Sequence, residues 1–218
     1  MYLSRVEINP RRRDTIKALS SPEVIHAAVM SSFPTIGREG GDRILWRIDE
    51  LGPSTYILVQ SSSKPDFTHI IEQFGWPDSE QQGETQDYTD FLFNIREGDI
   101  RNFKLRANPT RSIMEEKSSG KRGKVRQHIT AEQQLKWLFE KSEKCGFTLD
   151  SSETGAQIVK REDLRFKNKN NNISITAVSY EGTLKVNNTD EFIQSVKNGI
   201  GRAKAYGCGM LIVSRAIE

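Results

Sequence analysis

The chain has 218 residues, and its 32 Lys and Arg against 29 Asp and Glu leave a formal net charge of only +3. This length allows one large or two small domains with buried cores, and the near-balance of charge is by itself weak evidence for a nucleic-acid partner. The two cysteines, Cys145 and Cys208, have neither metal-ligand nor disulfide-framework spacing, and no apolar signal region or membrane-length run is present. We therefore expect a cytoplasmic protein with no metal and no other cofactor.

The first half predicts a regular alternation of strands and helices. Residues 1–8 alternate as a half-buried strand, which ends at Asn9-Pro10 before a basic loop. A helix then begins at about residue 20, because hydroxyl side chains, a proline and an acid occupy its first turn. It runs to Phe33, and we expect Val24 and Ala28 to share its apolar face, with His26 turned outward.

The rest of this half predicts strands at 43–49 and 55–60 joined by a tight turn, a helix at 66–74, an acidic loop at 75–90 and a strand at 91–95. The order is strand, helix, strand, strand, helix, strand. This is the order of a ferredoxin-like domain.

The second half begins as the first does. A strand at 100–107 ends at Asn108-Pro109, and a basic, glycine-containing loop and an amphipathic helix at 130–144 follow. Strands are predicted at 147–149, 157–160, 173–180, 182–186 and 210–213, with a helix from about residue 189 that stops at Gly199. The repetition predicts an α+β protein of two tandem ferredoxin-like domains, each with an antiparallel sheet and helices on one face. We place the domains at residues 1–97 and 98–218.

Near the C-terminus lies a segment that we call the glycine loop, residues 199–209. Its glycines allow close backbone approach and two cations add positive charge, so it is a candidate for binding a polyanion. The equally weighted alternative is a helix stop that leads into the last strand. Its context fits neither a dinucleotide fold nor a nucleoside-triphosphate loop. The candidate binding residues are Gly199, Gly201, Arg202, Lys204, Gly207 and Gly209.

Catalytic chemistry has few candidates. The three histidines, His26, His69 and His128, show no metal-ligand spacing, and no G-x-S-x-G elbow indicates an acyl hydrolase. His26 is in the first turns of a well-marked helix. A lone helical histidine is more often a packed or surface residue than a catalyst.

Six motifs occur in an order that resembles the CasE family, the CRISPR repeat-cleaving endoribonuclease and Cascade subunit of type I-E systems. The resemblance covers nearly the whole chain. The motifs are Asn9-Pro10, the Ile25-His26 helix ending in Phe33-Pro34, FKLRANP at 103–109, AEQQLKWL at 131–138, YEGTL at 180–184 and GIGRAKAYGCGML at 199–211.

The resemblance implies two RAMP-type ferredoxin-like domains and metal-independent cleavage of CRISPR precursor RNA at the base of the repeat hairpin. Attack by a 2′-hydroxyl would leave a 2′,3′-cyclic phosphate. The family keeps the mature guide RNA bound by its stem-loop and joins other Cascade subunits. We further expect no membrane contact and a monomer when the chain is free.

His26 stands where the family's catalytic histidine falls, as general acid or general base. Relatives often carry tyrosine three residues earlier, where this chain has Glu23, and a lysine five residues later, where it has Ser31. Glu23 is therefore a candidate catalytic residue that would raise the pKa of His26. The alternative is that Glu23 serves only the helix N-terminus.

We expect a basic run on strands of the second domain to form the RNA-binding surface, because A-form RNA is recognised mainly through phosphates and shape. Two other classes stay open: an RNA-binding scaffold of the same fold without catalysis, and an unrelated protein that binds a phosphate ligand in the glycine loop. A basic loop at 117–126 could also order on RNA. The remaining candidate residues are Lys160, Arg161, Arg165, Lys167 and Lys169, with Arg11, Arg12 and Arg13 contributing less directly.

Overall fold

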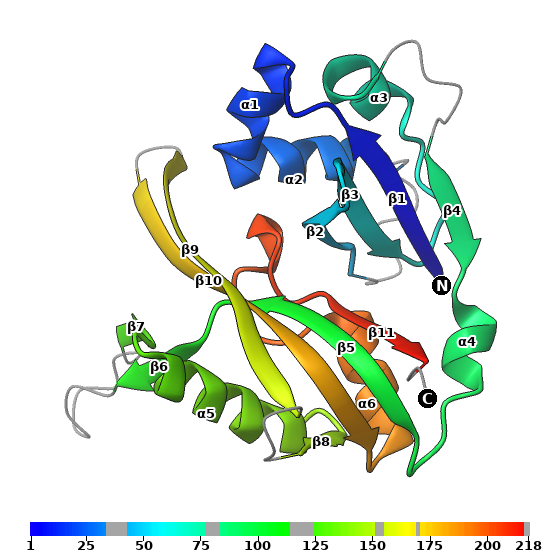
Figure 1. Ribbon diagram of the computed structural model, residues 1–218. Coiled ribbons are helices and arrows are strands. Elements are labelled where there is room, and N and C mark those ends of the chain that lie inside the picture. Colours follow the sequence, from blue (N-terminus) through cyan, green and yellow to red (C-terminus); the bar gives the residue numbers. More distant parts are fainter. Residues whose placement is uncertain (34–42, 77–82, 114–123, 151–154, 169–170, 216–218) are drawn as a thin grey trace.

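A computed structural model describes residues 1–33, 43–76, 83–113, 124–150, 155–168 and 171–215 (Figure 1). The first half forms a four-stranded antiparallel sheet in the order β2-β3-β1-β4. Its elements are β1 (Tyr2–Ile8), α1 (Arg13–Leu19), α2 (Pro22–Ser31), β2 (Leu45–Leu51), β3 (Ser54–Ser61), α3 (Thr68–Phe74) and β4 (Glu84–Asp87). This is the ferredoxin-like arrangement expected from the sequence.

After the short helix α4 (Thr89–Phe93), the second half repeats the plan with the order β11-β5-β10-β8, while β9 pairs with β10. A small hairpin, β6 with β7, is inserted after β5. The bounds are β5 (Ile100–Ala107), β6 (Thr110–Ile113), β7 (Lys124–Gln127), α5 (Ala131–Glu143), β8 (Phe147–Leu149), β9 (Ala156–Asn168), β10 (Asn171–Val186), α6 (Thr189–Asn198), the 3-10 turn η2 (Lys204–Tyr206) and β11 (Leu211–Arg215). The two tandem ferredoxin-like domains are thus confirmed.

Each half has its own apolar core, because alternate strand residues face the helices. In the first half, Val6 and Ile8 of β1 pack with Ile25 of α2. In the second, Leu105 of β5 and Tyr180 of β10 pack with helix α5. A smaller cluster of Leu45, Leu58 and Met210 joins the two halves.

The apolar face of α2 differs from the expected one. Val24 is 41% exposed, whereas Ile25 and Val29 are buried, so the expectation that Val24 faces the core is wrong. The buried positions still have helical spacing, one residue further along the chain. This rotation places His26 next to the buried face and leaves it half-buried.

Three further predictions were wrong. The basic loop after β1 contains α1, which buries only Thr15 and Ala18 and so carries almost no apolar pattern. The strand expected at 91–95 is helix α4, because Tyr88, Leu92 and Ile95 recur at helical spacing and enter the second core. The fourth strand is instead β4, within the expected acidic loop. All its side chains are exposed, so backbone pairing with β1 defines it.

The longest strands were underestimated. The strands expected at 157–160, 173–180 and 182–186 are parts of β9 and β10, and β9 pairs from end to end with residues 171–182 of β10. In Figure 1 their far ends extend beyond the sheet as a two-stranded projection that reaches toward α2. We call β9 and β10 the arm. No helix in the described part of the chain has the length and apolar character to cross a bilayer.

Candidate active site

His26 lies on α2 beside the buried face of the helix. Trp46, which is 2% exposed on β2, donates its indole N–H to Nδ1 of His26 across 3.3 Å. Because an indole nitrogen only donates, Nδ1 accepts, and the proton of the neutral imidazole is carried by Nε2. No local sequence pattern indicates this partner, because Trp46 lies on a different element.

Burial lowers the pKa of His26, which favours the neutral imidazole near pH 7. Glu23 is not among the causes of this shift, so a rise of the pKa of His26 caused by Glu23 stays a prediction. Glu23 lies in the first turn of α2, where its negative charge interacts favourably with the positive end of the helix dipole. Its assignment to catalysis stays a prediction.

The other two histidines lie apart from this position. Nε2 of His69 is 2.9 Å from the carbonyl oxygen of Ala28, so His69 donates to the C-terminal part of α2 and supports it. His128 follows β7, and burial and nearby Arg111 lower its pKa. Among the residues that the structure describes, no three His, Cys, Asp or Glu side chains are grouped as metal ligands.

The glycine loop lies directly beside His26 and Trp46. Its turn η2 packs against both α2 and β2. Gly207 has φ of +74°, and a Cβ there would lie 3.0 Å from Cζ3 of Trp46, so glycine allows the backbone to approach the indole. Gly199 ends α6, as the helix-stop interpretation expects. The loop therefore has a packing role, whether or not it also binds phosphate.

Two other glycines of this loop also pack closely against neighbouring residues. A Cβ at Gly201 would lie 3.1 Å from Trp137, and one at Gly209 would lie 2.9 Å from the Ile200 carbonyl oxygen. The side chain of Lys204 is half-buried; burial, followed by the charge of Arg43, lowers its pKa. Arg202 is exposed. Phosphate binding by the loop stays a prediction, for which Arg202 is the most accessible residue.

The arm has two different faces. Alternation along β9 exposes Arg161, Arg165 and Lys167 on one face and turns Leu164 and Phe166 to the other. Phe166 packs edge-on against Tyr206 of the glycine loop, with ring centroids 4.9 Å apart. Arg161, Arg165 and Lys167 thus share one face with the acid Asp163, and the opposite face rests on the glycine loop. Lys169 lies outside the described residues.

A second basic element, the β6/β7 hairpin, adjoins the arm. Arg111 and Arg126 are exposed and directly opposite each other. Gln127 accepts a 2.6 Å hydrogen bond from Thr176 of β10, and Arg161 donates to the Ile129 carbonyl oxygen at 2.6 Å. Sequence reasoning included Arg126 in the basic loop 117–126, of which residues 117–123 lie outside the described part, and missed Arg111. Arg111 could have been found as the first cation after Asn108-Pro109.

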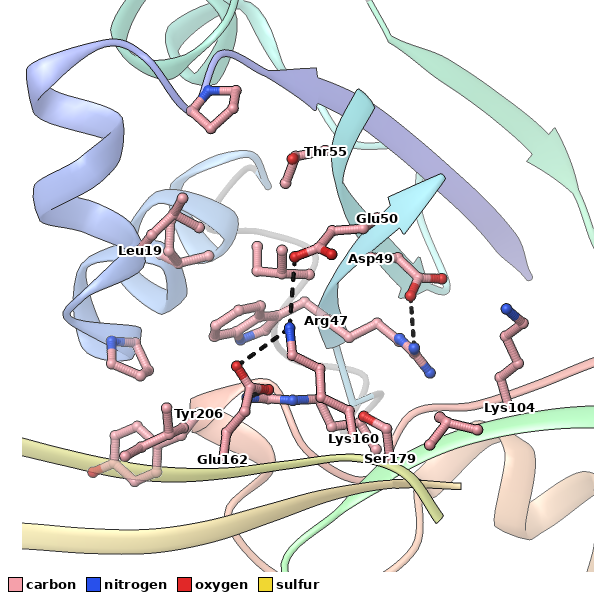
Figure 2. Close-up of a pocket in the computed structure, with 18 of the residues that line it drawn as sticks. Leu19, Arg47, Asp49, Glu50, Thr55, Lys104, Lys160, Glu162, Ser179 and Tyr206 are labelled. Carbon is pink, nitrogen blue, oxygen red and sulfur yellow. Dashed lines mark hydrogen bonds and ion pairs between the residues drawn. The ribbon is translucent and has the colours of Figure 1, made fainter. Parts of the chain in front are cut away.

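Lys160 belongs to neither basic face. It lines a cleft of about 460 Å³ between the two halves, where Nζ lies 3.5 Å from carboxylates of both Glu50 and Glu162 (Figure 2). Arg47 in the same cleft is buried and pairs with Asp49 at 2.7 Å. Lys160 therefore links the halves through Glu50, and its assignment to RNA stays a prediction.

The three arginines at the start of α1 have different surroundings. Nη1 of Arg12 donates to the Gly75 carbonyl oxygen at 3.2 Å and so connects this corner to the end of α3. Arg11 and Arg13 are exposed. Of the three arginines, Arg11 and Arg13 are therefore the more accessible to a ligand. Their contact with RNA stays a prediction.

Comparison with known proteins places this arrangement in a family. The sequence model of a family described as "CRISPR associated protein" matches residues 1–215. The chain belongs to this family of CRISPR-associated proteins. The helix that carries His26, the glycine loop and the arm all fall within the matched part.

Two relatives of this CRISPR-associated chain match over nearly their full lengths. It is 27% identical to the CRISPR-associated endoribonuclease Cse3 of Thermus thermophilus, over 98% of the chain and 100% of the relative. It is 26% identical to the Cascade subunit CasE of Escherichia coli, over 97% and 98%. A solved structure of Thermus thermophilus Cse3 bound to an RNA representing a pre-cleavage complex matches with a TM-score of 0.79 and 26% identity, covering 98% of each chain.

Proposed function

We propose that this chain is an endoribonuclease that cleaves CRISPR precursor RNA at the base of the repeat hairpin. The observation that carries the proposal is His26, a half-buried histidine beside the loop on which the basic arm rests. The similarity to an endoribonuclease over the full length of both chains supports it. The RNA-bound relative of the same fold supports RNA as the ligand.

The proposed reaction is attack by a ribose 2′-hydroxyl on the adjacent phosphate. It breaks the bond to the 5′-oxygen and leaves a 2′,3′-cyclic phosphate and a 5′-hydroxyl. The 2′-hydroxyl loses a proton, the 5′-oxygen gains one, and charge builds up on the phosphoryl oxygens. His26 has a titratable ring beside the cleft-lining Trp46, and we assign it a role at this phosphate.

We propose that the arm binds the phosphates of the RNA. Arg165 and Lys167 lie two residues apart on one strand face, and a strand rises about 3.3 Å per residue, so these two cations are spaced about 6.6 Å apart. This spacing is close to that of successive phosphates along one RNA strand. Arg161 lies on the same face about 13 Å from Arg165, with Asp163 between them. A-form RNA exposes phosphates and shape rather than base edges in its deep groove, so this contact would be largely independent of sequence.

We extend the proposal to the partners and the domains. The similarity to a Cascade subunit supports retention of the mature guide RNA and contact with other Cascade subunits. Cytoplasmic location and a monomeric free state remain proposals, as do the domain limits at residues 1–97 and 98–218. The separate cores of the two halves support two domains, and because Tyr88, Leu92 and Ile95 belong to the second core, they favour a division before residue 88.

The test is incubation of the chain with end-labelled repeat RNA in EDTA. We expect one cut at the base of the hairpin and a product that resists 3′-end ligation until acid opens its cyclic phosphate and a phosphatase then removes the resulting monophosphate. Binding without cleavage would favour the scaffold function, and neither binding nor cleavage would overturn the proposal. A linear 3′-hydroxyl product would mean different chemistry.

A further inference from the structure

The hydrogen bond between Trp46 and His26 fixes which nitrogen of the histidine meets the substrate. The indole N–H points at Nδ1, so a neutral His26 has its lone pair on Nδ1 and its proton on Nε2. A general base needs a lone pair on the nitrogen that faces the hydroxyl. In this arrangement the lone pair is already occupied, and the other nitrogen can only donate.

Trp46 is held too firmly to turn away. It is 2% exposed within the core of the first half and lies opposite Val59 in the register of β2 with β3. Gly207 closes over its ring, with only 3.0 Å between Cζ3 of Trp46 and the position of an added Cβ. The half-buried imidazole therefore adapts to the indole, rather than the reverse.

Protonation of His26 is opposed from the same side. A cationic imidazole carries a hydrogen on Nδ1, which would face the indole N–H and lose the hydrogen bond. Burial acts in the same direction and lowers the pKa of His26. No charged neighbour is among the causes of this shift. The titratable groups on α2 and on the described elements packed against it are Glu23, Arg13, Asp14, Lys17, Arg47, Asp49, Glu50, His69, Glu72, Lys204 and Tyr206.

We propose that Trp46 is a positioning residue that holds His26 in its neutral Nε2–H form, so that His26 donates a hydrogen bond to a phosphoryl oxygen of the RNA and does not act as the base. This inference rests on the proposed function. The hydrogen bond transfers no proton and stabilises the charge that develops on the phosphoryl oxygen as the 2′-oxygen attacks. A neutral histidine donor of this kind needs no titration between pH 6 and 8.

The decisive comparison is between Trp46→Phe and Val59→Ala. Phenylalanine keeps an aromatic ring but removes the N–H, whereas Val59→Ala loosens the packing behind Trp46 and keeps the N–H. Nitrogen-edited NMR of the RNA-free chain should show His26 of the parent in the Nε2–H form. In Trp46→Phe we expect a fraction in the Nδ1–H form and a pKa of His26 raised by roughly 0.5 to 1, as loss of one hydrogen bond predicts. Val59→Ala should leave both unchanged.

Cleavage at saturating RNA under single-turnover conditions gives the second readout. We expect Trp46→Phe to be slower by roughly twofold to tenfold, the same hydrogen bond expressed as a rate. An unchanged tautomer and pKa in Trp46→Phe would overturn the inference, and so would a faster variant, because Trp46 would then hold His26 inactive. Failure of the parent to cleave would overturn the proposed function instead, since the NMR readout requires no reaction.

Discussion

The two ferredoxin-like halves share one strand order, but one long hairpin in each half differs in length and in side-chain exposure. In the first half, β2 and β3 have 7 and 8 residues and lie within the sheet, and β2 contributes buried Trp46. In the second half, β9 and β10 have 13 and 16 residues, and the arm that they form carries exposed cations. A group that acts on a phosphate benefits from burial and a fixed orientation, whereas a grip on a polyanion benefits from exposed charge. One copy of the fold thus holds His26 in a fixed orientation, and the other copy exposes cations to a polyanion.

The glycine loop connects these two specialised hairpins. It belongs to the second half by sequence, yet Gly207 lies against Trp46 and Tyr206 lies against Phe166. Movement of the arm would thus be transmitted through a short stretch of backbone to the partner of His26. The comparison predicts that changes in the first half alter rate, changes in the arm alter affinity, and changes in the loop alter both.

The largest expected effect is that of His26→Ala. We expect the single-turnover cleavage rate to fall by ~10²–10³-fold, because a hydrogen-bond donor to the developing charge is lost, while RNA affinity changes little, because one side chain among many contacts is removed. His128→Ala is the matched control, since it removes another partly buried histidine whose pKa burial also lowers. Gel-shift and single-turnover measurements should separate the two variants. Equal rates for them would remove His26 from the mechanism.

The next effect tests the arm. Arg165→Ala combined with Lys167→Ala should weaken RNA binding and reduce the slope of log affinity against log salt by up to roughly 1.8, at about 0.9 per phosphate contact in duplex DNA. The rate at saturating RNA should persist. Lys144→Ala with Lys197→Ala removes two exposed cations outside the arm and should leave the slope unchanged. Equal slopes for both double variants would mean that the arm does not contact phosphates.

A smaller effect is expected in the glycine loop. Gly207→Ala places a Cβ against Trp46 at a φ of +74°, and we expect the free energy of unfolding to fall by ~1–3 kcal/mol. Gly52→Ala is the control, because its φ of +62° imposes similar backbone strain but no atom lies within 4 Å of the new Cβ. Urea unfolding measures the first difference. The cleavage rate should be lower for Gly207→Ala and unchanged for Gly52→Ala. An unchanged rate for Gly207→Ala would mean that the packing of the loop against Trp46 does not influence His26.

The parts of the fold that could be predicted are those with a strong local pattern. Alternating apolar residues revealed β1 and β5, and a capped, periodic segment revealed α5. Helix α4 was missed because five residues are too few to distinguish a period of 3.6 from one of 2. Strand β4 was missed because its residues are all exposed, and the free N–H and C=O groups of β1 stabilise it.

The site shows the same division. Family motifs pointed to His26, yet its partner Trp46 lies on another element and is recognisable only after β2 has packed beneath α2. Similarly, Gly207 reads as a flexible or phosphate-binding residue until its contact with Trp46 is seen. Lys160 reads as one more cation in a basic run until alternation along β9 places it on the face of Leu164, opposite Arg161, where it meets Glu50 of the first half. Side-chain identity is local, but these roles depend on contacts between distant segments.

The smallest expected effect concerns Glu23. Because burial lowers the pKa of folded His26 below its unfolded value near 6.5, the unfolded chain binds more protons between these two values. The contribution of His26 to stability therefore increases as pH rises through this window and is lost as pH falls. A rise of the pKa caused by Glu23 would give the opposite dependence.

Glu23→Gln tests this sign directly. Since burial causes the shift, we expect the variant to keep the parent's pH dependence of both cleavage rate and unfolding between about pH 5 and 7. It should lose only ~0.3–1 kcal/mol of stability, the contribution of an acid in the first turn of a helix. Asp190→Asn, which neutralises an acid in the first turn of α6, should lose a similar amount. A pH–rate profile that moves in Glu23→Gln but not in Asp190→Asn would instead make Glu23 part of the active site.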